Sequence, residues 1–281
     1  MNIQSICICG AGTMGTGIAQ VSATAGFHTI LYEVNDDILE KAKSSIQKNL
    51  QTLFEKNKIT VEERNQVSER IHFVSDSKRC VADLIIEAIV ENVEAKISLF
   101  HQLSNINDSQ TIYATNTSSL SVSEIASKVS HPEHVVGMHF FNPAPLMKLV
   151  EVVKAEKTSG DVVDTIVAVA HRMGKTPVIC KDSPGFIVNR VARPFYIESL
   201  RLIEESQTDF GTIDLLLEAT GFRMGPFKLM DLIGNDVNYS VSQSVYEQLK
   251  KPERLRPSYI QRQKVENGDL GKKTGRGYYQ Y

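Results

Sequence analysis

The sequence lacks any apolar run long enough to cross a bilayer as a helix, so we expect no membrane segment. It also lacks an excess of charge of either sign. Its 31 basic and 33 acidic residues give a net charge of −2, which offers no electrostatic reason to propose a nucleic-acid partner. Because the first expected strand begins at Ile3, we expect no signal or transit peptide. We therefore expect a cytoplasmic protein.

Cysteine is scarce, with four residues in 281. Cys7 and Cys9 lie two apart on an expected buried strand, so their side chains point to the same face. No second pair with metal-ligand spacing accompanies them. We interpret both as small buried hydrophobic residues, and we expect neither a metal site nor a disulfide. Free thiols fit a reducing compartment.

The chain does contain a glycine-rich turn in a specific context. An apolar strand from Ile3 leads into Gly10-Ala-Gly-Thr-Met-Gly15, a helical stretch follows, and a second strand ends at Glu33. A lone G-x-G-x-x-G is weak evidence, but strand, turn, helix and an acid about 20 residues on are the full dinucleotide-binding pattern. The residues that we expect to bind the cofactor here are Gly10, Gly12, Thr13, Met14, Gly15 and Glu33.

Each glycine in this pattern has a physical role. Gly10 permits the tight turn, Gly12 lets the backbone approach a pyrophosphate, and Gly15 allows the helix to pack closely. The helix N-terminus offers N–H groups and a partial positive charge to phosphates. Glu33 can accept hydrogen bonds from ribose hydroxyls and would repel a 2′-phosphate, while Val34 supplies no cation to hold one. This favours NAD over NADP.

Strand and helix patterns alternate as far as Cys180, which predicts an α/β fold with a Rossmann-type, doubly wound, mostly parallel sheet. Two expected helices, a long one after Asn35 and a shorter one at 62–69, form an excursion from this sheet. Beyond Gly185 the periodicity is helical, apart from a candidate strand at 278–281. We predict an NAD-binding domain over 1–183 and an all-helical domain over 184–281. The expected helices of the second domain are 187–205, 211–220 and 236–249.

His139 is the first candidate for a catalytic residue, because it ends the apolar strand 135–139. A lone histidine there is more often structural, so it needs a partner, and Glu151 is the candidate. If the two strands form a hairpin around Pro145, these residues lie opposite each other with Cβ atoms about 4.5–5.5 Å apart. A carboxylate at that distance would orient the imidazole as a general base.

Two further polar segments lie where a substrate could bind. Asn116-Thr-Ser-Ser119 directly follows an expected strand, and the carboxyl ends of strands form the ligand crevice of open α/β sheets. The alternative is a capped loop-to-helix junction, but Ser121 already serves as that cap. Asn189 lies early in the first helix of the second domain, where its amide could reach a substrate.

Taken together, these motifs resemble the L-3-hydroxyacyl-CoA dehydrogenases, and most closely the short bacterial 3-hydroxybutyryl-CoA dehydrogenases. The resemblance rests on Asn116-Thr-Ser-Ser119, His139-Phe-Phe-Asn-Pro-Ala-Pro145, Lys148-Leu-Val-Glu151 and Lys181-Asp-Ser-Pro-Gly-Phe-Ile-Val-Asn189. It extends from the glycine turn to Gly271-Lys-Lys-Thr-Gly-Arg-Gly-Tyr-Tyr279. The linked motifs, in order, are far more specific than any one of them.

The resemblance implies a role for each matched residue. His139 corresponds to the catalytic base, Glu151 to its partner, and Ser118 and Asn189 to residues that hold and polarise the substrate. Residues that would contact the cofactor or its side of the site are Glu33, Glu91, Lys96 and Asn142. Asn49 and Lys56 correspond to contacts with the CoA part of an acyl-CoA substrate. The family's C-terminal domain implies a homodimer.

The expected reaction is NAD-dependent oxidation of L-3-hydroxyacyl-CoA to 3-ketoacyl-CoA and its reverse, the reduction of acetoacetyl-CoA. It would serve fatty-acid breakdown or butyrate and polyester routes, and the sequence fixes neither chain length nor direction. One alternative is a dehydrogenase of a free hydroxy acid or sugar acid on the same scaffold. Another is a catalytically silent NAD-binding protein.

Overall fold

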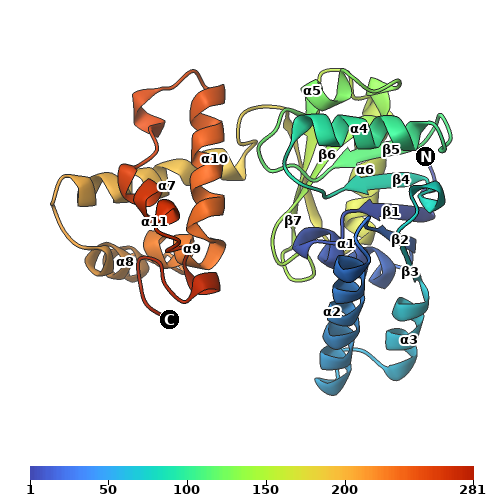
Figure 1. Cartoon of the computed structure of the whole chain (residues 1–281), viewed down its shortest axis with the longest axis horizontal. Helices are drawn as coiled ribbons and strands as arrows, with labels where there is room; N and C mark the ends of the chain where they lie inside the picture. Colours follow the sequence, from blue (N-terminus) through green and yellow to red (C-terminus); the bar gives the residue numbers. More distant parts are fainter. The chain divides into compact units, whose positions relative to one another are not determined.

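The computed structural model describes residues 1–281, which form two compact units, Met1–Asp182 and Ser183–Tyr281. The division falls one residue before the boundary expected from the sequence. In Figure 1 the first unit runs from blue to yellow and contains the sheet, whereas the second, in orange and red, is helical. None of the helices combines the length and apolarity that crossing a membrane requires.

One eight-stranded sheet organises the first unit, with the order β3-β2-β1-β4-β5-β6-β7-β8. The pairing is parallel except between β6 and β7, which are antiparallel. This confirms the predicted doubly wound, mostly parallel fold. The strands are β1 (Ser5–Cys9), β2 (His28–Tyr32), β3 (Ile71–Val74), β4 (Leu84–Glu87), β5 (Ile112–Thr115), β6 (Val135–Phe140), β7 (Leu149–Lys154) and β8 (Thr176–Lys181).

Helices flank this sheet, and the central strands are buried because parallel strands are covered on both faces. Residues Leu84–Glu87 of β4, for example, are all fully buried. The helical elements of the first unit are α1 (Thr13–Thr24), α2 (Asp36–Glu55), α3 (Val61–Glu69), η1 (Ser77–Arg79), α4 (Val93–Ser104), α5 (Val122–Ala126), η2 (Pro132–His134) and α6 (Gly160–Arg172).

Helices α2 and α3 form the predicted excursion, and Figure 1 shows both projecting beyond the sheet. The Asn35 side chain caps α2 by accepting hydrogen bonds from the N–H groups of Asp37 and Ile38, at 2.9 and 3.1 Å. The buried stripe of α2 includes Leu39, whereas Ile38 is 39% exposed. Adjacent apolar residues at a helix start leave the facing position ambiguous in a sequence.

The second unit contains five α-helices and two 3-10 turns. Its apolar core includes Phe227 and Met230, which are both fully buried. The elements are α7 (Val188–Glu204), α8 (Phe210–Ala219), α9 (Pro226–Ile233), α10 (Asn235–Gln248), η3 (Glu253–Leu255), α11 (Tyr259–Glu266) and η4 (Lys272–Thr274). Helices α9 and α11 were not predicted, because eight residues are too few to establish a periodicity.

The prediction of a strand at 278–281 was wrong. Within this segment only Gln280 forms a bridge, an isolated one with Arg276. The buried carboxylate of Asp231 binds it instead, accepting hydrogen bonds from the N–H groups of Tyr278 at 2.9 Å and Tyr279 at 3.0 Å. A side-chain anchor therefore replaces the strand ladder at this end of the chain.

Candidate active site

Residues at or next to the carboxyl ends of four neighbouring strands lie at one edge of the sheet, and they include several of the predicted site residues. Gly10 follows β1, Ala88 follows β4, Asn116 follows β5, and His139 is the penultimate residue of β6. Strand β1 is the point at which the strand order reverses, because β2 and β3 follow on one side of it and β4 and β5 on the other. Ligands of doubly wound sheets bind at such a switch point.

The glycine turn is packed so closely that side chains are excluded at two positions. Gly10 has a φ of +102°, and a Cβ there would lie 2.6 Å from the carbonyl oxygen of Ala88. A Cβ on Gly15 would lie 1.8 Å from the carbonyl oxygen of Gly10. Helix α1 therefore packs directly against the end of β1, so the N-terminus of α1 lies at this edge of the sheet.

The residues at this turn fit a dinucleotide. A Cβ on Gly12 would meet nothing within 4 Å, so the space in front of the turn is open. No side chain caps the N-terminus of α1, which leaves its backbone donors for phosphate oxygens. Glu33 lies beside them, because its carboxylate accepts hydrogen bonds from the N–H groups of Ala11 at 3.0 Å and Asn35 at 3.2 Å. Two carboxylate oxygens retain further acceptor capacity for ribose hydroxyls.

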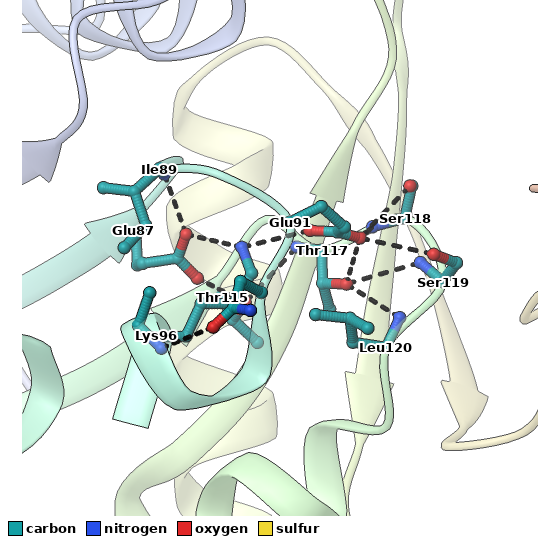
Figure 2. Close-up of polar contacts among 11 residues, drawn as sticks. Glu87, Ile89, Glu91, Lys96, Thr115, Thr117, Ser118, Ser119 and Leu120 are labelled. Carbon is teal, nitrogen blue, oxygen red and sulfur yellow. Dashed lines mark hydrogen bonds and ion pairs between the residues drawn. The ribbon is translucent and has the colours of Figure 1, made fainter. Parts of the chain in front are cut away.

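Lys96 lies at the centre of a buried charge cluster beside this turn (Figure 2). Its side chain is 1% exposed, and its Nζ lies 2.6 Å from Oε1 of Glu87 and 3.1 Å from Oε2 of Glu91. Burial raises the pKa of Glu87, against the effect of the Lys96 charge. Glu91 and Lys96 were predicted as site residues from the sequence, whereas Glu87 was not. An acid that ends the buried apolar strand 84–87 was the available signal.

Glu91 connects this cluster to the loop after β5. Its Oε1 accepts hydrogen bonds from the Thr117 hydroxyl at 2.6 Å and from the N–H and hydroxyl of Ser118 at 3.0 and 3.3 Å. Burial alone would raise the pKa of Glu91, but the Lys96 charge and these bonds outweigh it, so the pKa is lowered. Figure 2 shows the loop residues converging on this one carboxylate. The backbone and hydroxyl of Ser118 are thereby fixed at the edge of the sheet.

His139 and Glu151 lie opposite each other on the antiparallel strands β6 and β7, as the hairpin interpretation predicted. His139 Nδ1 and Glu151 Oε2 are 2.8 Å apart, and the two residues are 6% and 1% exposed. The ring of Phe141 packs against the imidazole, with centroids 4.5 Å apart. The imidazole is therefore held on two sides, by a carboxylate and by an aromatic ring.

The loop after β5 is joined to the histidine strand by Asn116. Its Oδ1 accepts a hydrogen bond of 2.9 Å from the N–H of Phe140, next to His139. The Ser118 loop and the histidine are thus tied to one another through adjacent strands, β5 and β6. The segment that begins at Asn116 was predicted as a possible substrate contact, but this hydrogen bond to the histidine strand was not predicted.

Lys175 stabilises the turn that carries Asn142 through hydrogen bonds to its backbone. The buried Nζ of Lys175 donates to the carbonyl oxygens of Ala144 and Met147, the latter at 2.9 Å. The same turn packs on α1, because a Cβ on Gly17 would lie 3.1 Å from the Cβ of Ala144. The Asn142 turn therefore contacts the helix that begins at the glycine turn, which links the cofactor side to the histidine strands.

The remaining predicted residues lie elsewhere. Asn49 and Lys56 are exposed on and just after α2, and the Asn49 amide donates to Gln20 Oε1 at 3.2 Å. Asn189 belongs to the second unit, in the first turn of α7. Its carbonyl accepts a hydrogen bond of 3.0 Å from Arg193 Nε. The first unit thus brings together its predicted cofactor and catalytic residues, whereas the predicted CoA contacts lie on the helical excursion.

Comparison with known proteins matches both units. Residues 5–183 match the family model of the 3-hydroxyacyl-CoA dehydrogenase NAD-binding domain, and residues 185–281 match that of the C-terminal domain. The chain is 43% identical to a 3-hydroxyadipyl-CoA dehydrogenase of Escherichia coli, covering all of this chain and 60% of that protein. It is 40% identical to a probable 3-hydroxybutyryl-CoA dehydrogenase of Bacillus subtilis, covering 100% of this chain and 98% of that protein.

Solved structures agree with these relatives. The (S)-3-hydroxybutyryl-CoA dehydrogenase of Ralstonia eutropha is 34% identical and superposes with a TM-score of 0.95, over 100% of this chain and 99% of that one. The chain therefore belongs to the 3-hydroxyacyl-CoA dehydrogenase family, whose members are NAD-dependent oxidoreductases.

Proposed function

We propose that this protein oxidises L-3-hydroxyacyl-CoA, with 3-hydroxybutyryl-CoA as the favoured substrate, and that it catalyses the reverse reduction of acetoacetyl-CoA. The observation that carries the proposal is the buried 2.8 Å contact between His139 Nδ1 and Glu151 Oε2 at the carboxyl edge of the sheet. It adds an acid–base pair to a nucleotide-binding turn. The similarity to relatives named for 3-hydroxybutyryl-CoA supports the substrate.

His139 acts as the base in the oxidation direction. With Nδ1 engaged by Glu151, the imidazole takes the proton of the substrate hydroxyl at Nε2. The NAD⁺ held at the glycine turn supplies the hydride acceptor when bound. Glu151 stabilises the imidazolium that forms, as a buried carboxylate next to a cation does. In the reverse direction the imidazolium returns that proton to the carbonyl oxygen.

Ser118 and Asn189 position the substrate in this proposal. Glu91 holds Ser118 through its N–H and hydroxyl, which fixes the loop on which the substrate carbonyl would rest. Asn189 would supply an amide from the second unit. Positioning of this kind raises the rate by holding the reacting atoms in a productive geometry.

The exposed Lys56 and Asn49 are proposed to contact the CoA part. The K56Q variant should raise the KM for acetoacetyl-CoA and leave the KM for NADH unchanged, because Lys56 is proposed to contact the phosphates of CoA, whereas the pyrophosphate of NADH is proposed to bind at the glycine turn. K58Q is the matched control, since Lys58 is also exposed on the same connection after α2. Equal effects of K56Q and K58Q would remove Lys56 from the CoA site.

The test of the reaction is NADH consumption with acetoacetyl-CoA, run beside free acetoacetate and beside NADPH. Rapid loss of NADH with the CoA ester alone supports the proposal and the preference for NADH. Activity on the free acid would favour a hydroxy-acid dehydrogenase on the same scaffold. NADH binding without turnover on either substrate would indicate a silent NAD-binding protein.

A further inference from the structure

Three buried thiols that the proposed reaction does not use lie together in the first unit. Cys7 and Cys9 are on β1, whereas Cys80 follows η1 in the connection between β3 and β4. The sulfur atoms all lie within 4.8 Å of one another, and each of the three residues is 0% exposed. All three are free cysteines. The third thiol is distant in the sequence, so the spacing of Cys7 and Cys9 alone could not indicate this cluster.

The separation of the Cys7 and Cys9 sulfur atoms matches that of two ligands in a metal site. The sulfur atoms of Cys7 and Cys9 are 3.9 Å apart. Two thiolates bound to one tetrahedral ion at about 2.3 Å each lie about 3.8 Å from each other. The existing separation thus already suits a shared ion. A disulfide between these residues is disfavoured, because positions two apart on a strand have Cα atoms about 6.6 Å apart, at the upper end of the bridgeable range.

The cluster also has an entry route. Cys80 directly follows η1, a single 3-10 turn whose Lys78 and Arg79 are exposed. Short exposed turns open at low free energy compared with the strands of a core. An ion could therefore reach Cys80 first and the two strand thiols next, without disruption of β1.

We propose that Cys7, Cys9 and Cys80 bind a thiolate-preferring metal ion of the Cu(I) and Zn(II) class. Soft sulfur ligands select such ions over the harder Mg²⁺ and Ca²⁺. Binding breaks the S–H bond of each coordinating thiol, releases its proton to solvent and forms a sulfur–metal bond, with no change of oxidation state. The site adjoins the cofactor turn, because Cys9 directly precedes Gly10 and pairs in register with Tyr32, next to Glu33.

Cd(II) is a suitable probe, because its thiolate complexes absorb in the ultraviolet through sulfur-to-metal charge transfer. We expect titration of the reduced, full-length protein to saturate at one Cd(II) per chain. C80S should weaken binding by more than the ~10–100-fold that loss of an outer-shell partner causes. C180S is the matched control and should bind as the wild type does, since Cys180 lies on β8 at the far edge of the sheet.

A second measurement uses the unaltered protein, so it holds even if C80S does not fold. Cd(II) should slow alkylation of Cys7, Cys9 and Cys80, as followed by peptide mass spectrometry, and should leave the rate at Cys180 unchanged. Absence of the charge-transfer band, or equal protection of all four cysteines, would overturn the proposal. So would a stable disulfide among the three under the conditions of titration.

Discussion

Lys96 compensates the negative charges of two carboxylates, Glu87 and Glu91, beside the glycine turn. It is 1% exposed and lies within 3.1 Å of carboxylate oxygens from both Glu87 and Glu91. Removal of one partner of a buried ion pair leaves an uncompensated charge, which is strongly destabilising. The cluster therefore holds the loop after β4 in place only while the lysine is present.

The K96M variant tests this dependence. We expect it to lower the free energy of unfolding by about 3–5 kcal/mol, because Glu87 would remain buried without its cation. K43M, which removes the exposed Lys43–Glu40 pair, should change it by less than about 1 kcal/mol. Urea unfolding of the three proteins measures both values. Equal, small effects of the two substitutions would show that the buried cluster contributes little.

Glu91 gives the molecule a defined pH response. Its folded-state pKa is lowered, so its stabilising contribution is present at neutral pH and is lost as the pH falls through that value. In the E91Q variant this contribution is absent at every pH. We expect the gap in unfolding free energy between wild type and E91Q to be largest near pH 7 and to narrow below about pH 4.3, the usual pKa of glutamate. A gap that stays constant with pH would contradict this role.

At the scale of elements, the join between β1 and α1 positions the cofactor site. Gly10 and Gly15 serve packing, because a side chain at either would collide with a carbonyl oxygen. Gly12 differs, since its φ of −67° suits any residue and its Cβ position is open. The two kinds of glycine can therefore be separated by experiment.

The G12A variant should fold as the wild type does but bind NADH at least about tenfold more weakly, a loss of ~1.4 kcal/mol, because the added methyl occupies the approach of the pyrophosphate. G160A is the matched control, as Gly160 also starts a helix with an open Cβ position. Fluorescence titration with NADH and thermal unfolding report the two properties. Unchanged NADH affinity in G12A would mean that the pyrophosphate does not approach this turn.

Elements that follow from local chemistry were predictable from the sequence. The glycine turn, the Asn35 cap and the facing positions 139 and 151 depend on neighbouring residues or on one tight turn. The partnership of Lys96 with Glu87, and of Cys80 with Cys7 and Cys9, was not predictable. The first contact depends on how α4 is placed at the end of β4. The second depends on β1 and β4 becoming neighbours, and strand order is a property of the whole sheet.

At the scale of the molecule, each unit has its own apolar core. The helical unit also exposes several large apolar side chains, including Val191, Leu215, Leu216 and Phe222 at 50–72% exposure. Exposed apolar surface of this kind often marks an interface between proteins. We therefore retain the proposal of a homodimer formed through residues 184–281.

Light scattering after size exclusion tests this assembly. We expect a particle of twice the 31.3 kDa mass of one chain at micromolar concentration. A particle with the mass of a single chain at the concentrations of the enzyme assay would contradict the dimer, and would leave the exposed apolar residues without a partner copy.

The pairing of His139 with Glu151 is the central claim, and a double-mutant cycle in the acetoacetyl-CoA assay tests it most directly. H139A should lower kcat by about 10²–10⁴-fold while NADH affinity is retained, because general acid–base assistance is lost. Since Glu151 acts only through the imidazole, adding E151Q to H139A should lower kcat no further, although E151Q alone is slow. H101A, at an exposed histidine, controls for loss of a histidine in itself. The account would be contradicted if the double variant lost more kcat than H139A alone, by the factor that E151Q alone causes. Full activity in H139A would also contradict it.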